Sequence, residues 1–244
     1  MNPSRIGAIL SLGLVIGCSS IEKQLTDPSY HGPFRTDYNC GGAGPAVLKG
    51  VRRVAVLPTA TPEFQPSEVH RETARLLHSI LLDEIRASAP FEAVPVFPDT
   101  HRLLEGADQL RVTAAIPPQV LKDIRQQTEA DTVLFSSLTA YRPYPPILVG
   151  LKVSLVRIDD GAILWQFDDA WNAGDAPTLN DARRFFREKL GVETEPPPSP
   201  SMSSPSRFMR YSASVVVQMY QKAKNAGPGG ITTGESTGKR TGKR

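Results

Sequence analysis

The chain has 244 residues, a formal net charge of +3, 40% hydrophobic and 22% charged residues, and two cysteines. This length and composition fit a globular protein with a sizeable core, and two cysteines cannot make a disulfide framework. The positive charge does not predict a nucleic-acid-binding surface, because the excess lies in the last twenty residues. There, Lys239, Arg240, Lys243 and Arg244 outnumber Glu235, and the body of the chain is close to neutral.

The first residues have the pattern of a secretory signal. Residues 1–5 carry one positive charge, residues 6–16 carry none, and Gly17-Cys18 follows. The uncharged run of about 11 residues is shorter than the roughly 20 that a membrane-spanning helix needs. We therefore expect residues 1–17 to be a signal peptide that is removed by cleavage between Gly17 and Cys18.

The cysteine at this boundary belongs to a short motif. Val15-Ile16-Gly17-Cys18 resembles the lipobox of bacterial lipoproteins. The resemblance implies that the Cys18 sulfur carries a diacylglycerol and that the new amine is acylated, for example with palmitate. Serine rather than aspartate follows the cysteine, which implies a lipid anchor in the outer membrane with the protein facing the periplasm. The alternative is an ordinary secretory peptide with an incidental cysteine.

Residues 18–50 are rich in Gly, Pro, Ser, Asp and Tyr and show no period of 2 or 3.6. This predicts a lipidated, flexible tether that lets the folded part stand off the membrane. Cys40 lies in this stretch without a partner in the chain, so an intermolecular disulfide and a free thiol both remain open.

An α/β domain is expected over residues 51–190. VRRVAVLPT, from residue 51, reads as a first strand that Pro58 ends. Ser67 is a candidate N-cap for a helix over about 68–88. Its apolar residues fall on one broad stripe expected to face a sheet, namely Val69, Leu76, Leu77, Ile80, Leu81 and Ile85.

A second strand, FEAVPVF at 91–97, is expected near a sheet edge because Pro95 cannot donate a ladder hydrogen bond. Pro117-Pro118 begins another helix. The third strand, TVLFSSLTAY, starts at Thr132.

A hairpin follows. In ILVGLKVSLVRI the apolar residues alternate from Ile147 to Leu155, and Asp159-Asp160-Gly161 is a turn in which glycine can adopt a positive φ. In AILWQFDDAW, residues Ile163, Trp165 and Phe167 continue the alternation. Both strands should be antiparallel, with one apolar face.

Helices are expected at 177–190 and 207–224, separated by a Pro/Ser linker at 191–206 and followed by a disordered basic tail at 225–244. The second helix should dock back on the domain. The fold class is therefore α/β (α+β), with a mixed sheet of about five strands in the order β-α-β-α-β-β-β, followed by two helices.

No catalytic, metal or cofactor pattern is present. The four histidines are scattered, and Asp168 and Asp169 are adjacent on a strand, so their side chains point to opposite faces. GESTGKR near the C-terminus lacks the first glycine and the Ser/Thr of a phosphate loop. We expect no catalytic residue, metal, cofactor or nucleic-acid partner.

One connection is a candidate binding site. Tyr141-Arg142-Pro143-Tyr144-Pro145-Pro146 combines Tyr and Arg, which are enriched at interface hot spots, with prolines, which reduce the entropy lost on binding. We take Tyr141, Arg142 and Tyr144 as possible partner-binding residues. The alternative is a turn that only joins two strands.

The element order, with EADTVLF and DGAILWQF, resembles a group of bacterial envelope lipoproteins. Their domain is related to the N-terminal domain of TolB, to the curli-secretion CsgG family and to penicillin-binding-protein activator lipoproteins. The resemblance implies a non-enzymatic protein that acts through protein contacts, and it carries no site residues. A membrane-anchored binding or assembly factor is the first hypothesis. The alternatives are a structural subunit of an envelope ring or secretion complex, a homo-oligomer, and an enzyme without a recognisable motif.

Overall fold

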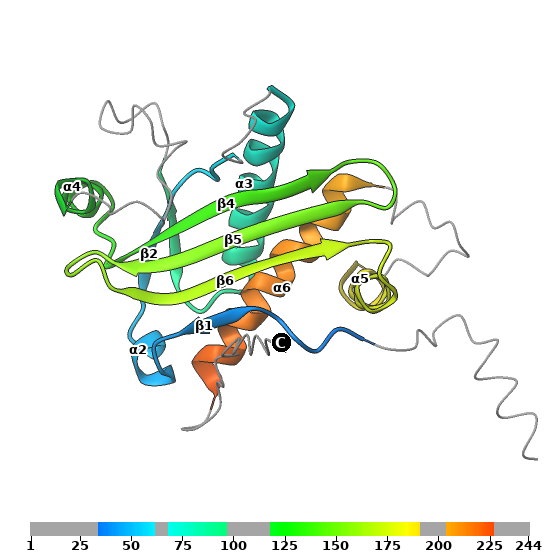
Figure 1. Ribbon diagram of the computed structural model, residues 1–244. Coiled ribbons are helices and arrows are strands. Elements are labelled where there is room, and N and C mark those ends of the chain that lie inside the picture. The colour runs from blue at the N-terminus through cyan, green and yellow to red at the C-terminus, as the bar shows by residue number, and fades with distance from the viewer. Residues whose placement is uncertain (1–33, 62–67, 97–117, 191–203, 227–244) are drawn as a thin grey trace, which may run out of the picture.

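One six-stranded mixed sheet organises the chain (Figure 1). The structure, a computed structural model, describes residues 34–61, 68–96, 118–190 and 204–226. The α/β class expected from the sequence is confirmed, with one strand more than expected. The elements are β1 (Cys40–Gly42), α2 (Pro45–Lys49), β2 (Arg53–Val56), α3 (Glu68–Ser88), β3 (Glu92–Pro95), α4 (Pro118–Thr128), β4 (Thr132–Arg142), β5 (Leu148–Arg157), β6 (Ile163–Asn172), α5 (Ala176–Leu190) and α6 (Pro205–Asn225).

The strands lie in the order β1-β6-β5-β4-β2-β3. β2 pairs in parallel with both β3 and β4, while β4, β5, β6 and β1 pair antiparallel in turn. The strand that contains Pro95 lies at the sheet edge, as its missing donor predicts. At the opposite edge, β1 pairs with β6 from Cys40 against Phe167 to Gly42 against Trp165.

The predicted hairpin forms, and Gly161 in its turn has φ +68°. Every second residue of β5 from Val149 to Leu155 is buried. The alternation fails at Ile163, which is 41% exposed. A register shift between Leu155 and Val156 places Val156 opposite Ile163, and the extra residue of such a bulge moves the side chains beyond it to the other face.

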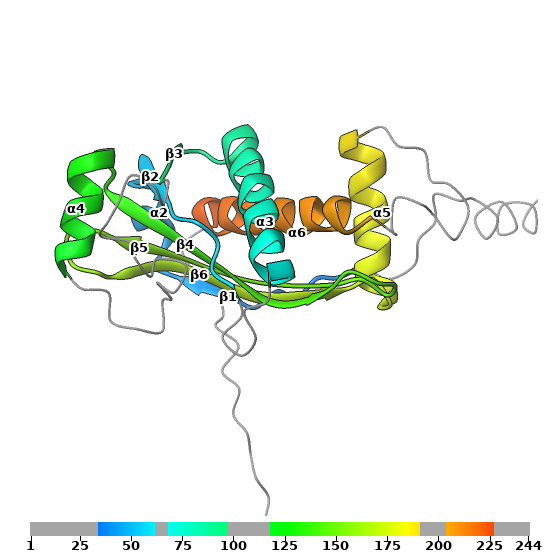
Figure 2. The same cartoon turned by 90° about the horizontal axis from the view of Figure 1, so that it is seen from above.

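The main core lies between the sheet and the helices α3, α5 and α6, which Figure 2 shows on one side of the strands. A smaller core joins Leu121 and Ile124 of α4 to the alternate residues Val133, Phe135 and Val156. Since successive side chains of a strand point to opposite faces, α4 packs against the opposite face of the sheet.

The apolar stripe expected on α3 is only partly buried. Leu77, Ile80, Leu81 and Ile85 are in the core, but Val69 is 59% and Leu76 43% exposed. At 100° per residue, these two positions lie about 100° away from the middle of the buried face.

The expectation of a flexible tether over residues 18–50 is wrong for residues 40–49, because β1 and α2 lie there and Leu48 is fully buried. A three-residue strand of Cys-Gly-Gly has no periodicity that sequence inspection can detect. A side chain at Gly42 would place its Cβ 2.4 Å from the Leu164 carbonyl oxygen, so this close approach to β6 needs glycine. α6 begins two residues before the expected start and docks on the domain as predicted.

Several expectations fall outside the described residues: the signal peptide, the lipidation site Cys18, most of the Pro/Ser linker and the basic tail. None of the helices in the described ranges is long and apolar enough to cross a membrane.

Candidate partner-binding end of the sheet

The connection between β4 and β5 is held at both of its ends. The Arg142 Nε donates a hydrogen bond to the Pro146 carbonyl oxygen (2.7 Å), which closes the loop on itself. The Ala173 amide donates to the Ile147 carbonyl oxygen (2.8 Å), and this joins the loop to the turn after β6. The Pro145–Pro146 peptide bond is cis. The two hydrogen bonds hold the loop as a fixed projection from the sheet.

The three candidate binding residues have different surroundings. Tyr144 is 75% exposed, the largest exposed fraction among the large apolar and aromatic side chains of the described residues. Arg142 is exposed, although its Nε bonds the loop backbone. Tyr141 is half-buried against the main core, and burial raises the pKa of its hydroxyl, with a smaller opposing effect from Thr73 of α3. Tyr144 is thus the member of the set that a partner reaches without displacing other contacts.

The first turns of α3 lie beside this loop, because Thr73 contacts the Tyr141 hydroxyl. Val69 and Leu76 flank Thr73 along the helix, and both are exposed. Exposed aliphatic side chains therefore lie on the part of α3 that contacts Tyr141, the residue that precedes the loop. Sequence analysis assigned these two residues to the core, and their position at the margin of the stripe was the signal that they face solvent.

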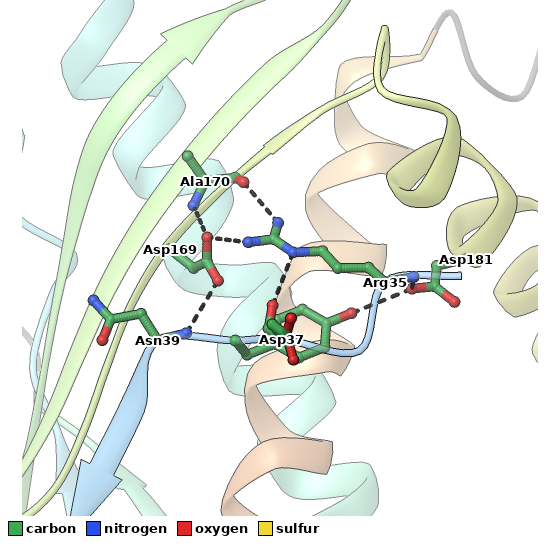
Figure 3. A network of polar contacts seen from close by, with 7 residues as sticks. Arg35, Asp37, Asn39, Asp169, Ala170 and Asp181 are labelled. Carbon is green, nitrogen blue, oxygen red and sulfur yellow. Dashed lines mark hydrogen bonds and ion pairs between the residues drawn. The ribbon is translucent and has the colours of Figure 1, made fainter. Parts of the chain in front are cut away.

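A polar network holds the chain just before β1 against the same end of the sheet (Figure 3). We call residues 34–42 the edge segment. The Arg35 guanidinium donates to the Ala170 carbonyl oxygen (2.9 Å) and pairs with the Asp169 carboxylate. The other Asp169 oxygen accepts from the Asn39 amide (3.3 Å). The edge segment is thereby fixed to the last residues of β6.

Asp181 of α5 binds the same segment from the other side. It accepts hydrogen bonds from the Arg35 amide (3.0 Å) and the Tyr38 hydroxyl (3.3 Å), and Arg184 contacts its other oxygen (2.8 Å). Burial raises the pKa of the Asp181 carboxyl, and these donors oppose the increase. Burial and the charge of Asp181 together raise the pKa of Tyr38 to about 12.

The edge segment and the Tyr144 loop lie at the same end of the sheet. β5 starts directly after the loop, and its first residues Leu148–Leu151 pair with Asn172–Asp169 of β6. Asp169 is the residue that holds Arg35. The described chain begins at Phe34, whose ring lies against Arg184 of α5 at this end of the sheet.

The described residues contain no cluster of three or more His, Cys, Asp or Glu side chains that could hold a metal ion. The side chains of Asp168 and Asp169 point apart, as expected. The Asp168 Oδ2 lies 3.5 Å from the Lys152 Nζ, whereas the Asp169 carboxylate pairs with Arg35. Cys40 is a half-buried free cysteine in β1, and burial raises its thiol pKa. The two carboxylates are thus each paired with a cation, and Cys40 is a single thiol in a strand.

No protein-family model and no curated protein matches the chain. Solved structures with some likeness include the PelC dodecamer from Paraburkholderia phytofirmans (18% identity, 59% of this chain and 88% of that chain, TM-score 0.38). Another is the lipoprotein GNA1162 from Neisseria meningitidis (18% identity, 49% of this chain and 79% of that chain, TM-score 0.31). A third is the LpoB C-terminal domain from Salmonella enterica (15% identity, 53% of this chain and 96% of that chain, TM-score 0.31). These likenesses assign no partner and no activity to the chain.

Proposed function

We propose that this protein is a lipid-anchored periplasmic lipoprotein of the outer membrane that binds another envelope protein and catalyses no reaction. The Tyr144 loop carries the proposal, because a projecting aromatic side chain on a fixed backbone loses little entropy when it is bound. Val69 and Leu76 of α3, the helix that contacts Tyr141, are also exposed and add apolar surface on this side of the molecule. A turn that only joined two strands would not need this exposed aromatic group.

The anchor is tested at Cys18. Cys18→Ala removes the sulfur that the lipobox motif would modify, and we expect it to abolish labelling with a radioactive fatty acid and to release the protein from the membrane fraction. Cys40→Ala is the matched control, because Cys40 is the chain's other cysteine. Labelling that persists in Cys18→Ala would contradict the lipid anchor.

The binding loop is tested by photocrosslinking in intact cells. A photoreactive phenylalanine analogue replaces Tyr144 in one strain and Ile163 in another, and adducts are identified by mass spectrometry. Ile163 is a suitable control because it is also exposed and lies beside the β5–β6 turn, at the far end of the same strands (Figure 1). We expect one dominant envelope protein to be captured from position 144 and not from position 163.

The other outcomes are equally informative. Adducts between copies of this chain from position 144 would contradict the adaptor proposal and favour a ring or other homo-oligomer. Equal capture from both positions would show that the loop has no specific role.

A further inference from the structure

The last turns of α6 lie beside α2, at the end of the molecule away from α5, as Figure 1 and Figure 2 both show. The Tyr220 hydroxyl joins the two helices by its hydrogen bond to the Leu48 carbonyl oxygen (3.2 Å). Lys49 follows Leu48 directly, and Arg52 is three residues further on. Lys224 lies one helical turn beyond Tyr220. We call Lys49, Arg52 and Lys224 the basic end.

The three cations of the basic end are not neutralised. Lys49 and Arg52 are exposed and Lys224 is half-buried. None of the three makes a salt bridge within the described residues. The charge of Asp131 reaches Tyr220, but this one carboxylate accepts a hydrogen bond from the Thr132 hydroxyl (2.8 Å). Positive charge therefore remains in excess on this side of the sheet.

Two other carboxylates near this end of the sheet lie on its opposite face. Arg53 begins β2 and alternates with Ala55 of the smaller core, so its side chain is on the α4 side. The Glu92 and Glu129 carboxylates lie 3.7 Å and 3.5 Å from the Arg53 guanidinium. Arg52 is one residue away along the same extended chain and takes the α6 side. The sheet thus separates these acids from the basic end.

The sequence after α6 adds positive charge from the same place. α6 ends at Asn225, one residue after Lys224, so residues 227–244 continue from the basic end. They contain TGKR twice in tandem and have one acid, Glu235, against four cations: Lys239, Arg240, Lys243 and Arg244. From residue 232 onward, every residue is Gly, Ser, Thr or charged. This part of the chain offers charge and small polar groups to a partner.

We infer that the basic end and residues 227–244 together bind the surface of an anionic lipid bilayer. Such a surface presents many phosphates without a fixed shape, so positive charge alone can recognise it. Each Lys or Arg near it strengthens binding about fivefold. The envelope location in the proposed function, on which this choice of partner rests in part, supplies phospholipid headgroups.

This contact is separate from the proposed lipid anchor. The anchor precedes Phe34, whose ring packs on Arg184 of α5, and α5 lies at the other end of α6 from the basic end. Charge attraction is screened by salt, whereas acyl chains are held by burial. The basic end therefore supplements the anchor and sets how the domain lies against a membrane.

The test uses the full chain with Cys18→Ala, so that no acyl chain can attach it to a vesicle. Flotation measures its partition onto vesicles of pure phosphatidylcholine and onto vesicles that also contain phosphatidylglycerol. We expect phosphatidylglycerol to strengthen binding at least about a hundredfold at low salt, and high salt to abolish this difference. The pure phosphatidylcholine vesicles measure any contribution of the apolar residues 6–16.

Two pairs of substitutions remove the same charge from different places. Lys49→Gln with Lys224→Gln should weaken binding to the phosphatidylglycerol vesicles at least about fivefold. Arg71→Gln with Arg75→Gln changes exposed residues in the first turns of α3, the part that contacts Tyr141, and should leave binding unchanged. Thermal unfolding midpoints equal to that of the parent chain would show that both pairs fold. Replacing the four cations of residues 239–244 by Gln should weaken binding at least about a hundredfold.

Three results would overturn the proposal. Equal binding to the two kinds of vesicle would exclude recognition of anionic lipid. Equal weakening by the two pairs would show that overall charge decides binding and not the basic end. Co-sedimentation with isolated cell-wall sacculi but not with vesicles would assign a different partner. Because every variant lacks the Cys18 sulfur and the assay contains no other protein, these results are independent of lipidation and of partner binding at the Tyr144 loop.

Discussion

The edge segment and α6 are both remote in sequence from the strands on which they dock, but they are held by different forces. The edge segment adds three strand residues and packs Tyr38 and Cys40, both only partly buried, against the core, and it is further held by charged and polar contacts at Arg35 and Asp181. α6 buries Phe208, Met209 and all of residues 211–217, and its apolar side chains pack in the main core with those of the sheet and α3. Attachment by burial of apolar area is insensitive to salt, whereas ion pairs at a surface are screened by it.

This difference predicts which attachment opens first. Regions with few buried apolar contacts open locally at a low free-energy cost, and the most apolar elements open only on global unfolding. We expect the edge segment to detach while α6 stays docked.

The largest effect is expected from Phe208→Ala in α6. Phe208 is fully buried, and removing a buried phenylalanine ring costs about 3–5 kcal/mol through lost burial and the cavity that remains. Urea unfolding measures this loss. Arg207→Ala changes the exposed neighbour and should cost less than about 0.5 kcal/mol. A similar loss in both variants would show that α6 is not held by its apolar face.

Tyr220 tests a polar contact inside the apolar attachment. Its buried hydroxyl donates to the Leu48 carbonyl oxygen (3.2 Å), and burial, with the charge of Asp131, raises its pKa to about 12. An unfolded tyrosine ionises near pH 10, so the folded state is fully stabilised below that pH and loses stability as pH rises toward 12.

The loss expected from this one group is roughly 3 kcal/mol. Tyr220→Phe should therefore show a shallower decline in unfolding free energy between pH 10 and 12. Its stability at pH 8 should be lower by about 1 kcal/mol for the lost hydrogen bond. An unchanged alkaline decline would contradict the assignment to Tyr220.

Arg35→Ala tests the attachment of the edge segment. We expect the free energy of unfolding this segment to fall by about 2 kcal/mol, because the pair with Asp169 is mostly buried. Hydrogen exchange of the Asp168 amide, which donates to Asn39, should accelerate about 30-fold, while amides within α6 keep their rates. Arg125→Ala breaks the exposed pair with Asp159 and should change stability by less than about 1 kcal/mol. Equal exchange in both variants would contradict a separate opening of this segment.

The same two regions show what sequence patterns can predict. α6 has an amphipathic repeat, so its existence and its docking were predicted within two residues. The edge segment has no repeat, and Arg35 meets its partners at 134 and 146 residues' separation. Neither Asp169 nor Asp181 has a local pattern that indicates such a contact. The prediction that Ile163 continues the buried alternation was wrong for a related reason. The bulge beside it depends on the register between β5 and β6, which the sequence of β6 alone does not show.

At the Tyr144 loop, composition alone made Tyr144 a candidate binding residue, and the structure shows that its side chain is exposed. Composition did not distinguish Tyr144 from Tyr141, because burial of Tyr141 depends on α3, which is more than fifty residues away in the chain. Exposure of Val69 and Leu76 likewise depends on how α3 is rotated against the sheet.

The pairing of β1 with β6 at the edge of the sheet has a mechanical consequence. The edge segment joins the rest of the fold to whatever precedes Phe34, so any tension from that side reaches the sheet first through β1. A pull along the strand axis loads the β1–β6 hydrogen bonds together with the Arg35–Asp169 pair in shear, while a perpendicular pull opens them one after another. The direction in which the domain is pulled therefore sets the force at which its edge yields.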